Sequence, residues 1–234
     1  MKSNVYHLYT CVSIAVPKEN EEVIKNESVL NALANRGTDA TYAYDTGVKQ
    51  VVDISTITVG NGRRGNYIGF VYYYPEKAIY NIPNHGSFVA LRPCWYESNV
   101  LRDNHPVANG GTYTTVPINL RKGYVSPNDI GAVAAVVLRQ DVAEHQDVVY
   151  NLAGDVSIPL QIAESLSRVI GKEVPYHQIS ATNFYSTLVN TALIPHLLAM
   201  DLTDHAGIET CLSTTLSIEV LLGRKPETVE QYLA

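Results

Sequence analysis

The chain has 234 residues, of which 46% are hydrophobic and 17% charged. This composition excludes a disordered protein, and the length allows a full core, because a domain of this size buries roughly 70% of the surface that it exposes when unfolded. The formal net charge of −6 argues against a nucleic-acid-binding surface, which needs an excess of Lys and Arg. The longest aliphatic run, 131–138, is too short to cross a membrane. We therefore expect a globular protein with neither a nucleic-acid nor a membrane partner.

The strand-like and helix-like segments alternate along the chain, a pattern typical of a parallel sheet covered by helices. The strand-like segments are 4–16, 48–59, 87–92 and 147–152, and the helix-like segments are 28–46, 74–82, 126–140, 157–170, 182–193 and 207–222. The pattern predicts an α/β fold with a parallel sheet in residues 1–155. It also predicts a smaller, mainly helical C-terminal part of the same domain in residues 156–234.

Three local signals predict where helices begin and end. Gly47 suits the residue after a helix, where a positive φ is needed. Ser126, Pro127 and Asp129 match a capping box with proline at the first helical position, so Asp129 is expected to reach back to the start of its own helix. Ser157 is expected to cap the helix that follows it.

The three cysteines, Cys11, Cys94 and Cys211, lie far apart in the sequence. Their number and spacing favour neither a disulfide framework nor a zinc site, so we expect a reducing compartment, the cytoplasm. A second set of metal-ligating residue types has spacings that do not place three ligands on one helix face, so we expect no metal site. This set is His196, Asp201, Asp204 and His205, and we interpret it as a solvated helix–loop boundary.

Residues 73–77 contain the pattern Tyr-x-x-x-Lys. On a helix, Tyr73 and Lys77 would share a face, and the ammonium would lower the pKa of the phenol so that Tyr73 could exchange a proton while Lys77 binds a cofactor hydroxyl. Ser55 or Thr56, at the end of the buried strand, would supply the hydroxyl that orients a carbonyl group. Pro75 disturbs this spacing unless the helix begins there, and chance also places a lysine after three tyrosines, so a purely structural interpretation stays open.

Residues 60–65, Gly-Asn-Gly-Arg-Arg-Gly, match the pattern G-x-G-x-x-G directly after a strand. Such a turn can hold a pyrophosphate at a helix N-terminus. Two arginines occupy its middle, however, and Arg92 stands at the end of the next strand where an acidic residue is usual; an arginine there would favour a 2′-phosphate. A basic surface loop is the alternative interpretation.

Five segments carry motifs of a known family in the family's order. They are 47–55 (GVKQVVDIS), 77–79 (KAI), 91–99 (LRPCWYESN), 125–131 (VSPNDIG) and 221–226 (LLGRKP). Together they resemble the NmrA-like family, an atypical branch of the short-chain dehydrogenase/reductase superfamily. The resemblance implies a Rossmann fold that binds NADP or NAD, and it extends over most of the chain.

The resemblance also implies site residues. The cofactor contacts would be Lys77, Thr10, Ser55 and Pro93, and the catalytic group Tyr73, Lys77 and Ser55. The family's first strand and Gly-rich turn would precede the segment 4–16, so we expect a Rossmann core truncated at its N-terminus. Such a core would leave a strand edge open, which favours a homodimer.

Three functions remain open at this stage. The first is an NAD(P)H-dependent oxidoreductase acting on a small carbonyl-type substrate. The second is a non-catalytic, redox-sensing regulator that binds a protein partner. The third is a degenerate family member that no longer binds the dinucleotide.

Overall fold

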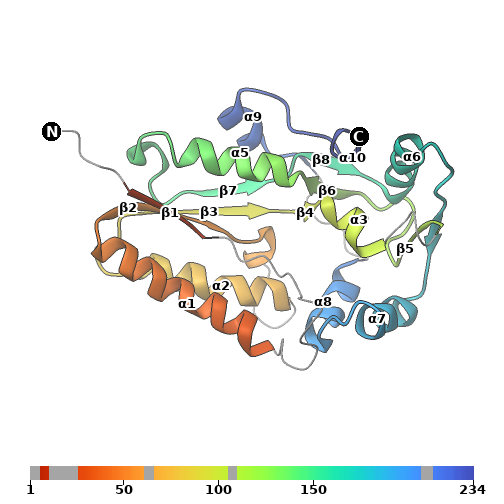
Figure 1. Cartoon of the computed structure of the whole chain (residues 1–234), viewed down its shortest axis with the longest axis horizontal. Coiled ribbons are helices and arrows are strands. Elements are labelled where there is room, and N and C mark those ends of the chain that lie inside the picture. Colours follow the sequence, from red (N-terminus) through yellow and green to blue (C-terminus); the bar gives the residue numbers. More distant parts are fainter. Residues whose placement is uncertain (1–5, 11–25, 61–65, 105–109, 207–212) are drawn as a thin grey trace. The chain divides into compact units, whose positions relative to one another are not determined.

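The structure is a computed structural model that describes residues 6–10, 26–60, 66–104, 110–206 and 213–234. The chain forms two compact units. Unit 1 comprises residues 1–92 and 134–150, and unit 2 comprises residues 93–133 and 151–234. The predicted α/β class, with a parallel sheet flanked by helices, is confirmed (Figure 1). The predicted division at residue 155 stays a prediction.

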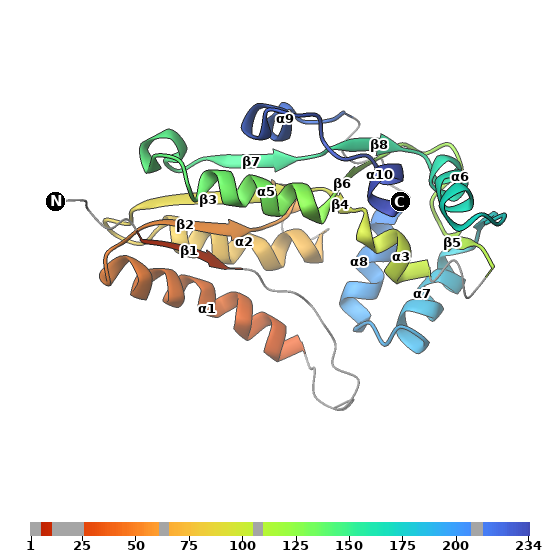
Figure 2. The ribbon, with the colours of Figure 1, turned by 45° about the horizontal axis from the view of Figure 1, so that its top comes forward.

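Unit 1 is built on a four-stranded sheet in the order β1-β2-β3-β7. Its strands are β1 (Tyr6–Thr10), β2 (Val48–Ile54), β3 (Ser87–Pro93) and β7 (Val149–Leu152). The pairs β1–β2 and β2–β3 are parallel, so their carboxyl ends meet at one edge. Helices α1 (Asn26–Asp45) and α2 (Tyr67–Tyr80) cover one face, and the part of α5 (Pro127–Val137) that belongs to unit 1, residues 134–137, lies on the other (Figures 1 and 2).

The core of unit 1 lies between the sheet and the two helices on the first face. Val51 of β2 and Phe88 and Ala90 of β3 pack with residues of α1 and α2, among them Ala40 and Ile79. Because side chains alternate along a strand, Asp53 points to the same face as Val51. This alternation places the last side chains of β2 beneath α1 and α2.

The helices α1 and α2 approach closely at Gly37. A Cβ atom on Gly37 would lie 3.0 Å from the Cβ of Ala78. The absence of a side chain at Gly37 therefore allows the two helices to approach each other. Gly47 has φ of +96° directly after α1, as predicted.

Two predicted boundaries in unit 1 are wrong. The strand β2 ends at Ile54 rather than at Val59, and a 3-10 helix, Ile57–Gly60, follows it. The helix α2 begins at Tyr67, seven residues before the predicted start, because Asn66 caps it by accepting a hydrogen bond from the amide of Gly69 at 2.7 Å. Residues 61–65 of the Gly-rich pattern lie outside the described residues.

Unit 2 contains a three-stranded sheet, β4-β6-β8, and a two-stranded sheet, β5-β9, together with helices. Its strands are β4 (Trp95–Tyr96), β5 (Thr112–Thr114), β6 (Lys122–Val125), β8 (Asp155–Ser157) and β9 (Tyr176–Gln178). Its helices are α3 (Ser98–Asn104), α6 (Pro159–Ile170), α7 (Ala181–Asn190), α8 (His196–Ala206), α9 (Leu216–Leu222) and α10 (Val229–Leu233). Val100, Leu166 and Val229 belong to its core.

The predicted capping box at residues 126–129 is wrong in one half. The hydroxyl of Ser126 accepts a hydrogen bond from the amide of Asn128, as an N-cap does. The carboxylate of Asp129 instead accepts hydrogen bonds from Arg224 at 2.6 Å and from the amide of Glu227 at 2.7 Å. Asp129 therefore fastens the C-terminal segment, a partner 95 or more residues away that no local pattern indicates.

Two further predictions in unit 2 need correction. The helix α6 is capped by Ile158 and begins at Pro159, so Ser157 is not its cap. Residues 196–206 form the helix α8, whereas the sequence suggested a helix–loop boundary. Of the predicted helix 207–222, the structure shows α9, and residues 207–212 lie outside the described residues.

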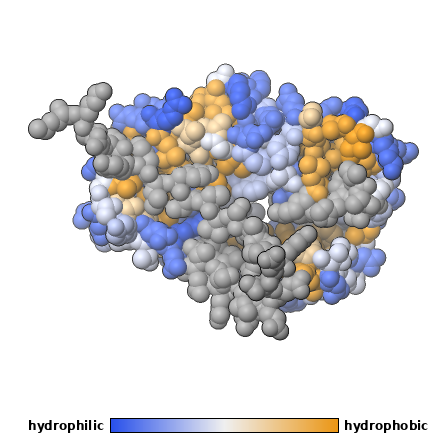
Figure 3. All heavy atoms as spheres, in the orientation of Figure 1, coloured by the Kyte–Doolittle hydropathy of each residue, from blue (hydrophilic) through white to orange (hydrophobic). Residues whose placement is uncertain are grey.

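The surface in Figure 3 shows hydrophobic residues in separate patches between hydrophilic ones. Among the described side chains, Leu216 and Val220 of α9 are strongly exposed. A search of the described helices for one long and apolar enough to cross a bilayer finds none.

Candidate functional site at the carboxyl edge of β2

The carboxyl edge of the unit 1 sheet carries the predicted serine. The amide of Ser55, one residue beyond β2, donates a hydrogen bond to the carbonyl of Leu91 at 2.7 Å, which fixes its backbone beside β3. The side chain is 2% exposed, and its hydroxyl has no hydrogen-bond partner among the described residues. A buried hydroxyl without a partner is uncommon and indicates a group that a ligand or a water can satisfy.

The predicted Tyr73 and Lys77 lie together on α2. The Nζ of Lys77 lies 5.8 Å from the centroid of the Tyr73 ring, and the lysine side chain is exposed. Pro75 lies inside the helix and does not abolish the four-residue spacing. The structure thus brings the tyrosine and the lysine together, as the pattern predicts.

The predicted cofactor contacts Thr10 and Pro93 lie at the ends of strands. Thr10 is the last residue of β1 and pairs in register with Asp53, and Pro93 is the last residue of β3. Since β1, β2 and β3 are parallel neighbours, Thr10, Ser55 and Pro93 all come at carboxyl strand ends. In open α/β sheets, ligands bind at this edge.

Sequence reasoning missed a buried ion pair next to Ser55. Nη1 of Arg36 donates to Oδ1 and Oδ2 of Asp53 at 2.8 and 2.7 Å and to the carbonyl of Ile54 at 3.0 Å. The two side chains are 2% and 0% exposed. The one signal in the sequence was a lone aspartate within a run of β-branched residues, and nothing there identified its partner.

A second missed pair engages Arg92, which the sequence suggested as a contact for a 2′-phosphate. Its Nε donates to Oε1 of Glu76 at 2.9 Å, and its Nη2 donates to Oε2 of the same carboxylate. Glu76 lies on α2, between Tyr73 and Lys77. The pair anchors α2 to β3, so this side of the Arg92 guanidinium is already occupied.

Unit 2 contains two buried groups with shifted pKa values. Burial lowers the pKa of Lys122 to about 7, and its Nζ lies 4.2 Å from the centroid of the Trp95 ring and donates to the carbonyl of His205 at 3.1 Å. Burial and the nearby carboxylates, chiefly Asp155, raise the pKa of Glu97 to about 8. Neither group was singled out from the sequence.

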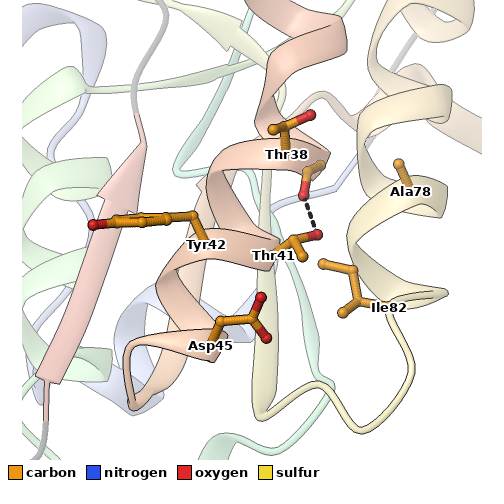
Figure 4. Close-up of a pocket in the computed structure, with 7 residues that line it drawn as sticks. Thr38, Thr41, Tyr42, Asp45, Ala78 and Ile82 are labelled. Carbon is orange, nitrogen blue, oxygen red and sulfur yellow. Dashed lines mark hydrogen bonds between the residues drawn. The ribbon is translucent and has the colours of Figure 1, made fainter.

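An open groove of about 570 Å³ lies between α1 and α2 (Figure 4). Its lining includes Thr38, Thr41 and Asp45 of α1 and Ala78 and Ile82 of α2. None of the predicted site residues lines this groove. We therefore place the candidate site at the carboxyl edge of β2 and not in the groove.

The described residues contain no cluster that could hold a metal ion, and His205 instead pairs with Asp201 at 3.3 Å. Cys94 is buried. Cys11 and Cys211 lie outside the described residues.

Comparisons with known proteins agree with this architecture, although no family model matches the chain. The chain is 28% identical over 151 residues to festuclavine synthase II of Penicillium roqueforti, covering 64% of this chain and 50% of that protein. It is 31% identical over 107 residues to quinone oxidoreductase 2 of Escherichia coli, covering 45% of this chain and 37% of that protein. The chain therefore spans about half or less of the length of these two relatives.

The solved structures match over more of the chain. The NADPH-dependent quinone oxidoreductase of Escherichia coli has a TM-score of 0.71 at 22% identity, covering 88% of this chain and 78% of that one. The triphenylmethane reductase of Citrobacter, solved with NADP(H), has a TM-score of 0.71 at 22% identity, covering 98% and 76%. NmrA, a negative transcriptional regulator solved with NAD, has a TM-score of 0.61 at 12% identity, covering 87% and 68%.

The chain has an NmrA-like fold. The resemblance found in the sequence is thereby confirmed for the fold.

Proposed function

We propose that this NmrA-like chain binds NADP or NAD and acts as an NAD(P)H-dependent oxidoreductase on a small carbonyl-type substrate. The observation that carries the proposal is the unpartnered hydroxyl of Ser55 at the carboxyl edge of β2, in the same unit as the Tyr73–Lys77 pair. The relatives named quinone oxidoreductase and triphenylmethane reductase support this class of activity.

The residues present fit the nicotinamide side of a dinucleotide. A buried donor without a partner, Ser55, stands at the strand end, and an exposed ammonium, Lys77, is free to reach a ribose hydroxyl. When bound, NAD(P)H supplies a hydride. Thr10 and Pro93, as strand-end residues, are proposed to contact the cofactor.

In this proposal each side chain has one role. Ser55 donates a hydrogen bond to the oxygen of the substrate carbonyl and orients it. Tyr73 supplies the proton that this oxygen takes up, and the charge of Lys77 stabilises the phenolate that remains. Ser55 thus places a hydrogen-bond donor at the carbonyl oxygen, and Lys77 places a positive charge near the phenolate, the two atoms on which negative charge develops.

Titration of the purified chain with NADPH and with NADH, followed by calorimetry, tests the proposal. We expect saturable binding, weakened at least several-fold by Lys77→Met. With a quinone or dye as oxidant, Tyr73→Phe should abolish turnover and keep cofactor binding. Tyr74→Phe, next to Tyr73 on the same helix, is the matched control and should keep both. Absence of binding at millimolar cofactor would refute the proposal.

A second candidate is a regulator that binds the dinucleotide without turning it over. The fold match to NmrA, a negative transcriptional regulator in complex with NAD, favours it. One assay distinguishes the two candidates. A regulator would bind NADPH or NADH, but neither the unmodified chain nor Tyr73→Phe would turn the cofactor over. Its partner would then be a regulatory protein.

We further propose a homodimer and a cytoplasmic location. The strand β1 stands at the end of the described sheet order, and an unpaired strand edge favours pairing with another copy. The small number and wide spacing of the cysteines suit a reducing compartment. Light scattering during size-exclusion chromatography tests the dimer, and a monomer at all concentrations would exclude it.

A further inference from the structure

We propose that the free edge of the Arg36 guanidinium, together with the hydroxyl of Ser55, binds an oxyanion that presents two oxygens, a carboxylate or a phosphate. The proposal goes beyond the proposed function, which gives Arg36 no ligand, and it rests on that function only in placing the ligand at the carboxyl edge of β2. The Ser55 hydroxyl has a single proton, so it donates to the oxyanion while no substrate carbonyl occupies it. The oxyanion would belong either to the substrate or to the dinucleotide.

The first observation is the set of donors that Arg36 leaves unused. Nη1 alone makes the three hydrogen bonds to Asp53 and Ile54. Nε and Nη2 have no acceptor among the described residues, although the side chain is only 2% exposed. Leaving buried donors of a charged group unpaired is strongly unfavourable, so this edge is a site that an acceptor would stabilise.

The second observation concerns the groups that other arginines of this chain bind through Nε and Nη2. Arg92 uses Nε and Nη2 to bind both oxygens of Glu76. Arg168 uses Nε and Nη2 to bind both oxygens of Glu230, at 2.8 and 2.7 Å. These two parallel N–H groups match the geometry of a carboxylate or phosphate. The free edge of Arg36 therefore fits a ligand of the same geometry.

The third observation is the arrangement around this edge. The carboxylate of Asp53 binds Arg36 of α1, so this side chain lies on the α1 face of β2, and Ser55 follows two residues later, just beyond the end of the same strand. The ring of Tyr72 lies 5.4 Å from the Cζ of Arg36. Asp53 balances the charge of the guanidinium, and the remaining groups, Nε–H, Nη2–H and the Ser55 hydroxyl, are able to donate. Such a set selects an acceptor and disfavours a cation.

Nuclear magnetic resonance of the arginine Nε–H groups in the full chain, labelled with ¹⁵N, tests the proposal directly. The Arg36 signal is assigned by its loss in Arg36→Lys. Inorganic phosphate and benzoate, a planar carboxylate, are titrated separately without cofactor. We expect one of them to shift the Arg36 signal saturably and to leave the Arg92 signal in place, because Glu76 already occupies that edge. A benzoate response assigns the site to a substrate carboxylate, and a phosphate response assigns it to the dinucleotide.

Two variants keep the test decisive if Arg36→Lys does not fold. Ser55→Ala removes one donor without touching the ion pair and should weaken binding of the responding anion about 5- to 10-fold by calorimetry. The double variant Arg36→Met/Asp53→Leu removes the pair as a unit and should abolish that binding. If neither anion shifts the signal, or if both variants bind the anion like the unmodified chain, the edge holds water only and the proposal is wrong.

The result is independent of the proposed function. A chain that binds benzoate through Arg36 but never binds NADPH or NADH would keep the oxyanion site and refute the dinucleotide proposal. A chain that binds NADPH equally well with and without the Arg36–Asp53 pair, and shows no response to either anion, would keep the dinucleotide proposal and refute the oxyanion site.

Discussion

Asp53 binds Arg36 through a single nitrogen, Nη1, and both side chains are buried at the end of β2. The pair links α1 to the strand that ends next to Ser55. It therefore serves the packing of unit 1, and it determines which edge of the guanidinium stays available.

Breaking this pair should destabilise the protein more than removing it. Arg36→Ala leaves the Asp53 carboxylate buried without its partner, and we expect a loss of about 3–5 kcal/mol in the free energy of unfolding. Arg36→Met/Asp53→Leu should recover most of this loss, since apolar residues of similar size often replace a buried pair without cost. Urea denaturation measures both. Equal losses in the two variants would contradict the explanation.

Glu97 should make the protein less stable as the pH rises. Burial and the charges of Asp155, Glu227 and Asp129 raise the pKa of Glu97 from 4.5 to about 8. Between pH 4.5 and about 8 the folded state therefore holds a proton that the unfolded state has released, and stability falls by an amount on the order of 2–4 kcal/mol. Denaturation from pH 5 to 9 measures this slope.

Glu97→Gln provides the control for that prediction. The amide keeps the size of the side chain and cannot release a proton. We expect a shallower dependence of stability on pH and a more stable protein at pH 8. If the variant shows the same slope as the unmodified chain, another group is responsible.

Lys122 should titrate near neutral pH, and the chain carries its own probe for it. Burial lowers the pKa of Lys122 from 10.5 to about 7, and its Nζ lies over the ring of Trp95, the one tryptophan in the sequence. Tryptophan fluorescence should therefore change with a midpoint near pH 7. Because the pKa of the folded state is the lower one, this group's contribution to stability is present above pH 10.5 and is lost as the pH falls through about 7.

Two variants identify the titrating group. Lys122→Met keeps the packing on Trp95 and should abolish the fluorescence transition. His205→Gln removes the nearby imidazole, whose pKa is raised by the hydrogen bond to Asp201, and should leave the transition in place. A transition that persists in Lys122→Met would contradict the assignment.

Gly69 and Gly131 should respond in opposite ways to alanine. A Cβ atom on Gly69 would lie 2.5 Å from the carbonyl oxygen of Thr58, so we expect Gly69→Ala to destabilise by about 1–3 kcal/mol. A Cβ atom on Gly131 would meet nothing within 4 Å, and within α5 the alanine should stabilise by about 0.4–1 kcal/mol. Thermal unfolding of the two variants checks the contrast, and destabilisation by both would contradict it.

The sequence predicts the positions of the helices and strands better than the contacts between them. The β-branched run at 48–54 and Gly47 at φ of +96° follow from local rules, as does the meeting of Tyr73 and Lys77 on one helix face. The early start of α2 depends on the cap at Asn66. This cap was not predicted, because Asn66 directly follows the Gly-rich pattern at 60–65, which suggested a loop.

Contacts between distant residues could not be predicted in the same way. Arg36 and Asp53 are 17 residues apart, and Asp129 and Arg224 are 95 apart. Each pair exists because separate elements meet, and one sequence carries no local sign of that meeting. The candidate edge was therefore predicted through Ser55 and the strand ends, and its buried arginine was not.

The contact at Gly37 has a consequence for how such a site can change. With 3.0 Å between Ala78 and a Cβ placed on Gly37, the distance between α1 and α2 depends on the size of two small residues. One added methyl group would displace α2, and with it Tyr73 and Lys77, relative to Ser55. Evolution or a designed library can therefore adjust the position of Tyr73 from positions 37 and 78, at the contact between the two helices, without replacing a single group at the strand ends.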